Sequence, residues 1–154
     1  MRPAALAVTA AATLALASSA GATLRYSTVA KGSDGGTAPQ RAYVALDAAA
    51  VERFTPRLRP EDRERVRAVD FRRFALVAAF VRLPTPCNPF AVRRVEQRGR
   101  TLLVAVAVGA GAREPCIQVI ATGYHVVKIR RRALGAARPT RAVLRGVGRD
   151  GRYR

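Results

Sequence analysis

The residues best suited to reactive chemistry in this chain of 154 are few: Cys87, Cys116 and the single histidine, His125. Two cysteines in an oxidising compartment are typical of a disulfide, and each one follows a proline and precedes a strand-like run. A metal site would have to recruit His125 and would have only three ligands, without a recognisable spacing. A cysteine nucleophile activated by His125 is a further alternative. We expect a structural disulfide between Cys87 and Cys116.

The other polar residues offer little catalytic chemistry. Ser27 and Ser33 lack the Gly-x-Ser-x-Gly context of a hydrolase. Residues 109–112 lack the Lys-Ser/Thr ending of a phosphate-binding loop. Asp70 is better suited to cap a strand entry than to act as a buried acid. We therefore expect no catalytic residues, no metal and no cofactor, and a protein that is not an enzyme.

The first 22 residues have the pattern of a secretory signal peptide. Arg2 precedes an uncharged apolar stretch at residues 4–17, and Ala20, Gly21 and Ala22 then form a small-x-small cleavage site. No cysteine follows that site and no twin-arginine pair precedes it, which favours Sec-type export. An uncleaved Ala-rich helix is the alternative. We expect cleavage after Ala22 and a secreted or cell-envelope protein with no transmembrane anchor.

Positive charge is concentrated towards the C-terminus. The chain has 28 Lys and Arg against 10 Asp and Glu, a net charge of +18, and residues 128–154 carry +9 of it. Such a tail is suited to anionic envelope polymers, anionic lipid or extracellular nucleic acid. Because only Tyr153 is available for stacking, specific nucleic-acid recognition is not expected. A solvated tail enriched in arginine by compositional drift is the alternative. The candidate anion-binding residues are Arg130, Arg131, Arg132, Arg138, Arg141 and Arg145.

Composition divides the chain into four parts. Residues 1–22 are the expected signal peptide. Residues 23–40 are small, polar and Gly-rich, so we expect a flexible leader. Residues 41–132 form the expected domain, and residues 133–154 a basic disordered tail.

Two short helices are expected early in the domain. A strand at residues 43–46 precedes Asp47, which is a suitable N-cap for a helix at 48–54. Pro60 is well placed as the first residue of a second helix, at 60–68. Few apolar residues are present there, which predicts a solvated connector.

From residue 69 the pattern becomes that of β-structure. Phe90 and Val92 follow the two-residue alternation of a strand, but Val95 lies three positions after Val92, which indicates a bulge. Gly99 marks a hairpin turn. Short connections favour an antiparallel meander or a small sandwich, so the predicted fold class is mainly β, α+β at the margin, with one or two short N-terminal helices and one disulfide. The expected strands are residues 74–81, 90–96, 101–108, 116–121 and 124–129.

Several motifs in this β-rich half resemble one family. They are Val69-Asp70-Phe71, the Pro84-Thr85-Pro86 turn, the strand opened by Phe90-Ala91-Val92-Arg93, the hairpin through Gln97-Arg98-Gly99-Arg100 and Ala121-Thr122-Gly123-Tyr124-His125-Val126-Val127. Together they resemble exported proteins related to the C-terminal domain of PrcB, the protease-complex stability subunit. Similar proteins often carry Gly-Gly or Gly-Tyr where this chain has Cys87-Asn88-Pro89-Phe90.

The resemblance implies a non-catalytic domain that associates with or stabilises a partner, with a protease as one candidate. Candidate partner-binding residues in these segments are Pro84, Pro86, Phe90, Tyr124 and His125. We therefore expect an exported accessory module that binds another exported protein. One alternative is an envelope-associated polycation that acts through its tail, and another is a protease inhibitor displaying residues 84–89.

Overall fold

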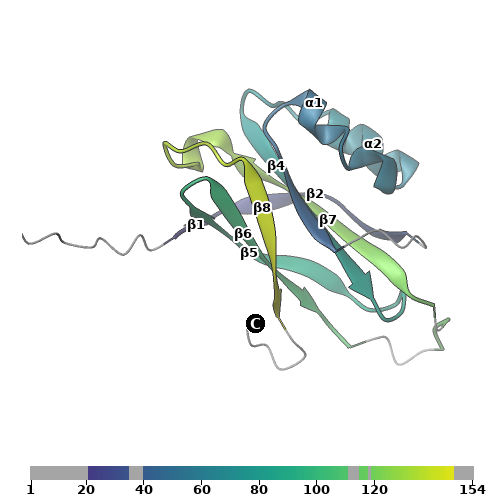
Figure 1. Ribbon diagram of the computed structural model, residues 1–154. Helices are drawn as coiled ribbons and strands as arrows, with labels where there is room; N and C mark the ends of the chain where they lie inside the picture. Colours follow the sequence, from purple (N-terminus) through teal and green to yellow (C-terminus); the bar gives the residue numbers. More distant parts are fainter. Residues whose placement is uncertain (1–20, 35–39, 111–114, 118, 148–154) are drawn as a thin grey trace, which may run out of the picture.

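The chain folds into three layers, two β-sheets and a layer of short helices (Figure 1). The computed structural model describes residues 21–34, 40–110, 115–117 and 119–147. Over these residues, eight strands form two four-stranded sheets. The sheet in the order β2-β7-β4-β3, here called the central sheet, lies between the helices and the other sheet. The second sheet, in the order β1-β5-β6-β8, is called the outer sheet.

Every neighbouring pair of strands in the central sheet is antiparallel. The two inner strands pair over ten residues, from Phe74 opposite Arg130 to Leu83 opposite Ala121. The inner strand β4 is a continuous apolar run because both of its faces are covered, one by the helices and one by the outer sheet. The strands of this sheet are β2 (Tyr26–Asp34), β3 (Arg41–Ala45), β4 (Phe74–Leu83) and β7 (Ala121–Arg130).

The outer sheet contains β1 (Ala22–Leu24), β5 (Phe90–Arg98), β6 (Thr101–Val108) and β8 (Arg141–Val147). A tight hairpin joins β5 to β6, whereas β8 runs parallel to β6 at the edge. The register between β5 and β6 shifts between Val92 and Arg94, which confirms the expected bulge. The shift lets both Val92 and Val95 point into the core, although three positions separate them.

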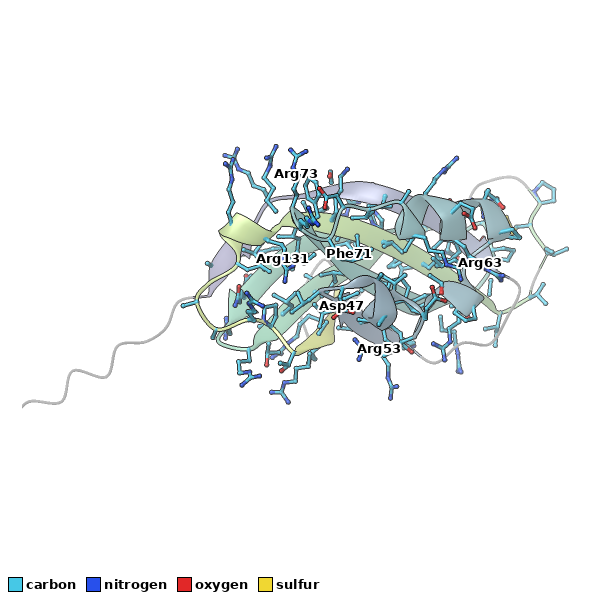
Figure 2. All side chains as sticks on the ribbon, turned by 90° about the horizontal axis from the view of Figure 1, so that it is seen from above. Asp47, Arg53, Arg63, Phe71, Arg73 and Arg131 are labelled. Carbon is cyan, nitrogen blue, oxygen red and sulfur yellow. A yellow bond between two sulfur atoms is a disulfide. The ribbon has the colours of Figure 1, made fainter. Side chains whose placement is uncertain are left out.

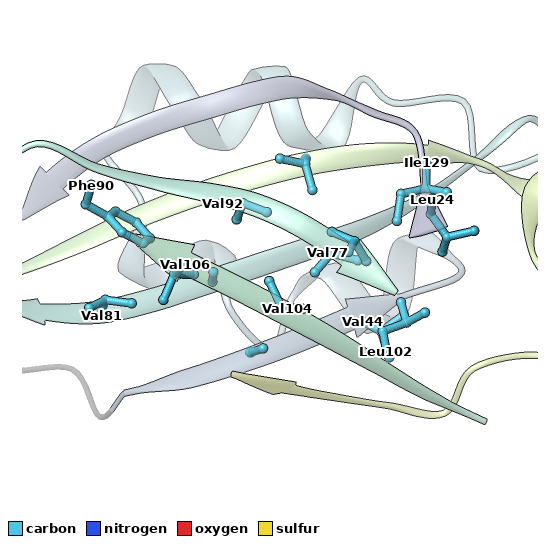
Figure 3. Close-up of a cluster of buried hydrophobic side chains, with 14 of the residues drawn as sticks. Leu24, Val44, Val77, Val81, Phe90, Val92, Leu102, Val104, Val106 and Ile129 are labelled. Carbon is cyan, nitrogen blue, oxygen red and sulfur yellow. The ribbon is translucent and has the colours of Figure 1, made fainter. Parts of the chain in front are cut away.

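The larger apolar core lies between the two sheets (Figure 3). Val77 and Val81 of β4 and Ile129 of β7 face side chains of β5 and β6 across it. Burying each such side chain stabilises the fold by about 1.5–3 kcal/mol. Several residues that were predicted to lie in strands therefore supply the main driving force for packing the sheets.

The helices cover the other face of the central sheet. They are α1 (Ala48–Val51), the 3₁₀ turn η1 (Thr55–Arg57) and α2 (Pro60–Arg67). Asp47 caps α1 as predicted, since its carboxylate accepts a hydrogen bond from the Ala50 N–H at 2.8 Å. The prediction that the second helix is a solvated connector was wrong: Val66 and Asp62, four positions apart on one face of α2, are fully buried against the sheet. No helix within the described ranges is long and apolar enough to cross a bilayer.

The predicted fold class is confirmed: the protein is mainly β, with two short α-helices and a disulfide. The arrangement is a sandwich of two sheets and not a single meander. The strand expected at residues 116–121 is wrong, because the backbone around Cys116 is irregular and β7 starts only at Ala121. Gly123 does not end a strand; it leaves room within β7 for Leu83 and Phe90, whose side chains a Cβ there would meet at 2.8 and 2.9 Å.

Two segments expected to lack regular structure contain strands. β1 and β2 lie in the expected leader, and β8 lies in the expected tail. All three are edge strands or short, so backbone pairing and one inward face suffice to order a polar sequence. The expected cleavage point after Ala22 falls inside β1, while residues 1–20, 35–39 and 148–154 lie outside the described residues.

Candidate functional site

The disulfide predicted from the cysteine count is present and joins two irregular segments at one end of the sandwich. Cys87 lies in the turn between β4 and β5, and Cys116 lies ahead of β7, with 6.3 Å between their Cα atoms. We call the two joined segments, residues 84–89 and the described part of 115–120, the braced end. A crosslink that closes 29 positions stabilises a fold by about 3–4 kcal/mol in the chain-entropy model.

Asn88 holds the turn of the braced end. Its side-chain oxygen accepts hydrogen bonds from the Thr85 N–H at 3.0 Å and the Thr85 hydroxyl at 2.9 Å. Its side-chain amide donates to the Gly109 carbonyl at 3.0 Å, and the Gly109 N–H donates to the Pro89 carbonyl at 2.7 Å. The turn is therefore tied both to itself and to the end of β6, in addition to the disulfide.

Three large apolar side chains of the braced end are exposed to solvent. Ile117 is 71% exposed, Ile120 53% and Val119 51%. Among the described residues, the only other large hydrophobic side chain exposed to a comparable degree is Val143, at 40%, on β8. Exposed apolar side chains gathered in one place mark interaction surfaces more often than isolated ones do. Sequence reasoning missed these three residues because it assigned them to a strand.

The predicted partner-binding prolines belong to the same end. Pro84 is exposed and Pro86 half-buried. Pro86 and Phe90 line a cavity of about 280 Å³ between the turn and β2. Phe90 itself is buried in the core between the sheets, so its side chain packs under the turn and is not available to a partner.

His125 lies in the interior and bridges the two sheets. The N–H of Val92, at the bulge of β5, donates to His125 Nδ1 at 2.9 Å. This bond requires the neutral tautomer with the proton on Nε2, which lies 2.9 Å from the Thr28 hydroxyl oxygen. Burial, with a smaller contribution from Lys31, lowers the pKa of His125 to about 4. Both ring nitrogens are thus committed to structural hydrogen bonds, and the side chain does not reach the surface.

Tyr124 is buried on the opposite face of β7, under α2. Its hydroxyl donates to the carboxylate of Asp62 and accepts from Arg59 Nε at 2.9 Å. Burial, together with the bond to Asp62, raises the pKa of Tyr124. Asp62 is fully buried and also pairs with Arg65 at 3.2 Å. This cluster was not predicted because the whole helix was expected to be solvated; the spacing of four between Asp62 and the apolar Val66 is the signal that separates Asp62 from its exposed neighbour Glu61.

The six arginines of the expected anion-binding tail are not gathered on one surface. Arg130, Arg131 and Arg132 lie at the end of β7 and in the 3₁₀ turn η2 (Arg131–Ala133), and Arg138 follows in a loop. Arg141 and Arg145 project from β8, where Arg141 donates to the Thr101 hydroxyl at 2.8 Å.

Arg131 has a structural role within this set. Its guanidinium donates to the Phe71 carbonyl at 2.7 Å, and its backbone N–H donates to the Arg73 carbonyl at 2.9 Å. In the view onto the helix layer, Phe71, Arg73 and Arg131 lie near one another, on the side of the molecule away from Arg63 (Figure 2). These bonds tie η2 to the segment that precedes β4.

The described part of the chain contains no group of three or more His, Cys, Asp or Glu side chains arranged to hold a metal ion. Asp70 lies at the surface, where its carboxylate accepts from the Arg72 N–H at 2.9 Å, which is the capping role expected for it. The buried polar side chains in these ranges, His125, Asp62 and Tyr124 among them, have hydrogen-bond partners within the protein. Comparisons of the chain with protein-family models, with curated proteins and with solved structures find no match.

Proposed function

We propose that this protein is an exported, non-catalytic accessory module that binds a partner protein through its braced end. The observation that carries the proposal is the exposure of Ile117, Val119 and Ile120 beside a disulfide. Leaving these side chains in water gives up the free energy of burial, about 1.5–3 kcal/mol for each fully buried side chain. A partner that covers them recovers this free energy.

The stiffness of the braced end supports the same proposal. The Asn88 hydrogen bonds hold residues 84–89, and the disulfide ties Cys116 of the second segment to them. A surface that is crosslinked before association loses less conformational entropy on binding. The disulfide itself is compatible with an exported protein, in which such bonds persist.

The partner we propose is another exported protein, and the resemblance to the PrcB-related family makes a protease the specific candidate. A buried His125 and a buried Tyr124 fit a supporting role for these two residues, since they hold β7 in place beneath the braced end.

Affinity capture from the exported fraction of the native culture tests the proposal. The triple variant Ile117→Ser/Val119→Ser/Ile120→Ser is compared with the unaltered protein and with Val143→Ser, which removes an exposed valine elsewhere. We expect one partner to be retained by the unaltered protein and by Val143→Ser and to be lost with the triple variant. Retention of the partner by all three proteins contradicts binding through the braced end. A partner that requires only the Arg-rich segment contradicts a module that binds through an apolar surface.

A further inference from the structure

A basic groove lies at the end of the central sheet opposite the braced end. It has a volume of about 690 Å³ and runs between the start of β4, the end of β7 and the corner that joins β1 to β2. None of the residues that line it is an Asp or a Glu. Its cations come from two segments: Arg25 from the β1–β2 corner, and Lys128, Arg130 and Arg132 from the end of β7 and η2.

Strand geometry places two of these cations on one face. Lys128 and Arg130 are two positions apart in β7, so their side chains leave the same face of the sheet about 7 Å apart. Phe74 lies directly opposite Arg130 in the register. The Lys128 ammonium lies 5.0 Å from the centre of the Phe74 ring, and the Arg73 guanidinium carbon lies 5.6 Å from it. The ring stabilises positive charge at the floor of the groove.

The groove cations have no ion pair among the described residues. The ion pairs that the structure contains there involve other arginines: Arg59, Arg65, Arg67, Arg94 and Arg98. Like charges placed side by side on a sheet destabilise it. A concave surface lined by one sign of charge also raises the local concentration of counter-ions. The arrangement costs stability in the free protein and favours an anionic ligand.

We propose that this groove binds a linear polymer that carries a phosphate in each repeat. Arginine's planar fork suits phosphate oxygens, which it can contact through two parallel hydrogen bonds. Cations that continue from the β1–β2 corner along β7 into η2 suit a chain of repeated charges better than a single anion. This site is distinct from the braced end, since the ten residues of β4 separate the two by about 30 Å.

Fluorescence anisotropy with labelled inorganic polyphosphate tests the proposal. The groove variant Arg25→Gln/Arg130→Gln/Arg132→Gln replaces three exposed arginines. The control Arg41→Gln/Arg82→Gln/Arg100→Gln removes the same charge from exposed positions outside the groove. We expect the groove variant to bind at least about tenfold more weakly, and the slope of log affinity against log salt to fall by about 2, since each phosphate contact contributes about 0.7. We expect the control to lose less than about threefold.

Thermal stability separates a binding role from a structural one. Because the groove cations repel one another, the groove variant should melt at the same temperature as the parent protein or higher. A lower melting temperature together with lost binding would indicate that these arginines support the fold, and would contradict the proposal.

Two further probes identify the ligand chemistry. Polyglutamate should bind more weakly than polyphosphate of equal charge, and vesicles containing phosphatidylglycerol should not compete for the groove. Equal losses in the groove variant and the control, or no polyphosphate binding at low salt, overturn the proposal. Groove-dependent binding to vesicles without binding to polyphosphate would assign the groove to a lipid surface instead.

Discussion

Val92 shows how single side chains join the two sheets. The bulge in β5 begins just after Val92, and side chains of the central sheet hydrogen-bond to both the backbone N–H and the carbonyl of this residue. His125 Nδ1 accepts from the N–H, and the Tyr26 hydroxyl donates to the carbonyl at 2.8 Å. Since buried backbone groups without partners cost about 1–3 kcal/mol each, these two side chains determine where the sheets meet.

The stability of the protein should fall in mild acid because of His125. The histidine titrates near 6.5 in the unfolded chain and near 4 in the folded protein, so the unfolded state binds more protons across this window. The free energy of unfolding should therefore fall as the pH drops from 6.5 towards 4, by on the order of 3 kcal/mol, since one pKa unit corresponds to about 1.4 kcal/mol. Urea unfolding at several pH values measures this change in the free energy of unfolding. The variant His125→Gln should lose less stability over the same window, and an unchanged pH dependence would contradict this account.

Gly32 is required by the cluster around Tyr124. A Cβ at this position would lie 2.6 Å from the Tyr124 hydroxyl oxygen, so alanine forces the buried ring and Arg59 to move. We expect Gly32→Ala to lower the free energy of unfolding by about 1–3 kcal/mol. Gly146→Ala is the matched control, because its Cβ meets nothing within 4 Å, and it should change stability by less than about 0.5 kcal/mol. Equal effects in chemical denaturation would show that Tyr124 does not need this space.

At the scale of elements, α2 is held to the central sheet by a buried polar contact as well as by Val66. The Asp62 carboxylate accepts from Tyr124 of β7 and from Arg59 at the start of its own helix. A short helix with few apolar residues gains its position from this carboxylate. The helix layer is therefore held by this hydrogen-bonded cluster in addition to its apolar contacts with the central sheet.

Removing that carboxylate should be costly. Asp62→Ala removes the acceptor of the buried Tyr124 hydroxyl and one charged partner each of Arg59 and Arg65, so we expect a loss of about 3 kcal/mol in unfolding free energy. Glu61→Ala is the control, because Glu61 is exposed and its pair with Arg59 is worth under about 1 kcal/mol. Guanidinium denaturation measures the unfolding free energy of both variants. Similar losses in the two would contradict the role of Asp62 in holding α2 on the central sheet.

Strong periodicity made part of this fold predictable. The apolar runs that became β4 and β6, the out-of-step Val95 and the Asp47 cap all follow local rules. The sequence did not predict β2 and β8, because each is an edge strand with few buried side chains and is ordered by long-range pairing with β7 or β6. The exposure of Ile117 and Ile120 was not predicted either, because a short apolar run reads the same in sequence whether it forms a buried strand or an exposed loop.

For the whole molecule, the ten residues of β4 separate two surfaces of opposite character. Its last residues lead into the apolar braced end, and its first residue lies in the basic groove. Four cations, Arg25, Lys128, Arg130 and Arg132, line the groove, and none of its lining residues is acidic. The proposed protein partner and the proposed polyanion would bind at opposite ends of β4.

The disulfide should contribute to both stability and binding. Cys87→Ala/Cys116→Ala should unfold with about 3–4 kcal/mol less free energy than the oxidised protein. It should also bind the partner more weakly under conditions where it stays folded, because the two segments are no longer joined. Calorimetry with and without reductant measures the first effect. If reduction of the unaltered protein left its melting temperature unchanged, the disulfide would not brace this end.

Titration of the captured partner against purified variants measures directly whether the braced end binds it. Truncating three apolar contacts at the centre of an interface should weaken Kd at least about tenfold for Ile117→Ser/Val119→Ser/Ile120→Ser, since each core contact can exceed 1 kcal/mol. Val143→Ser and the groove variant should stay within about threefold of the parent protein. If instead the triple variant keeps the parent's affinity while the groove variant loses it, the braced end is not the protein-binding surface.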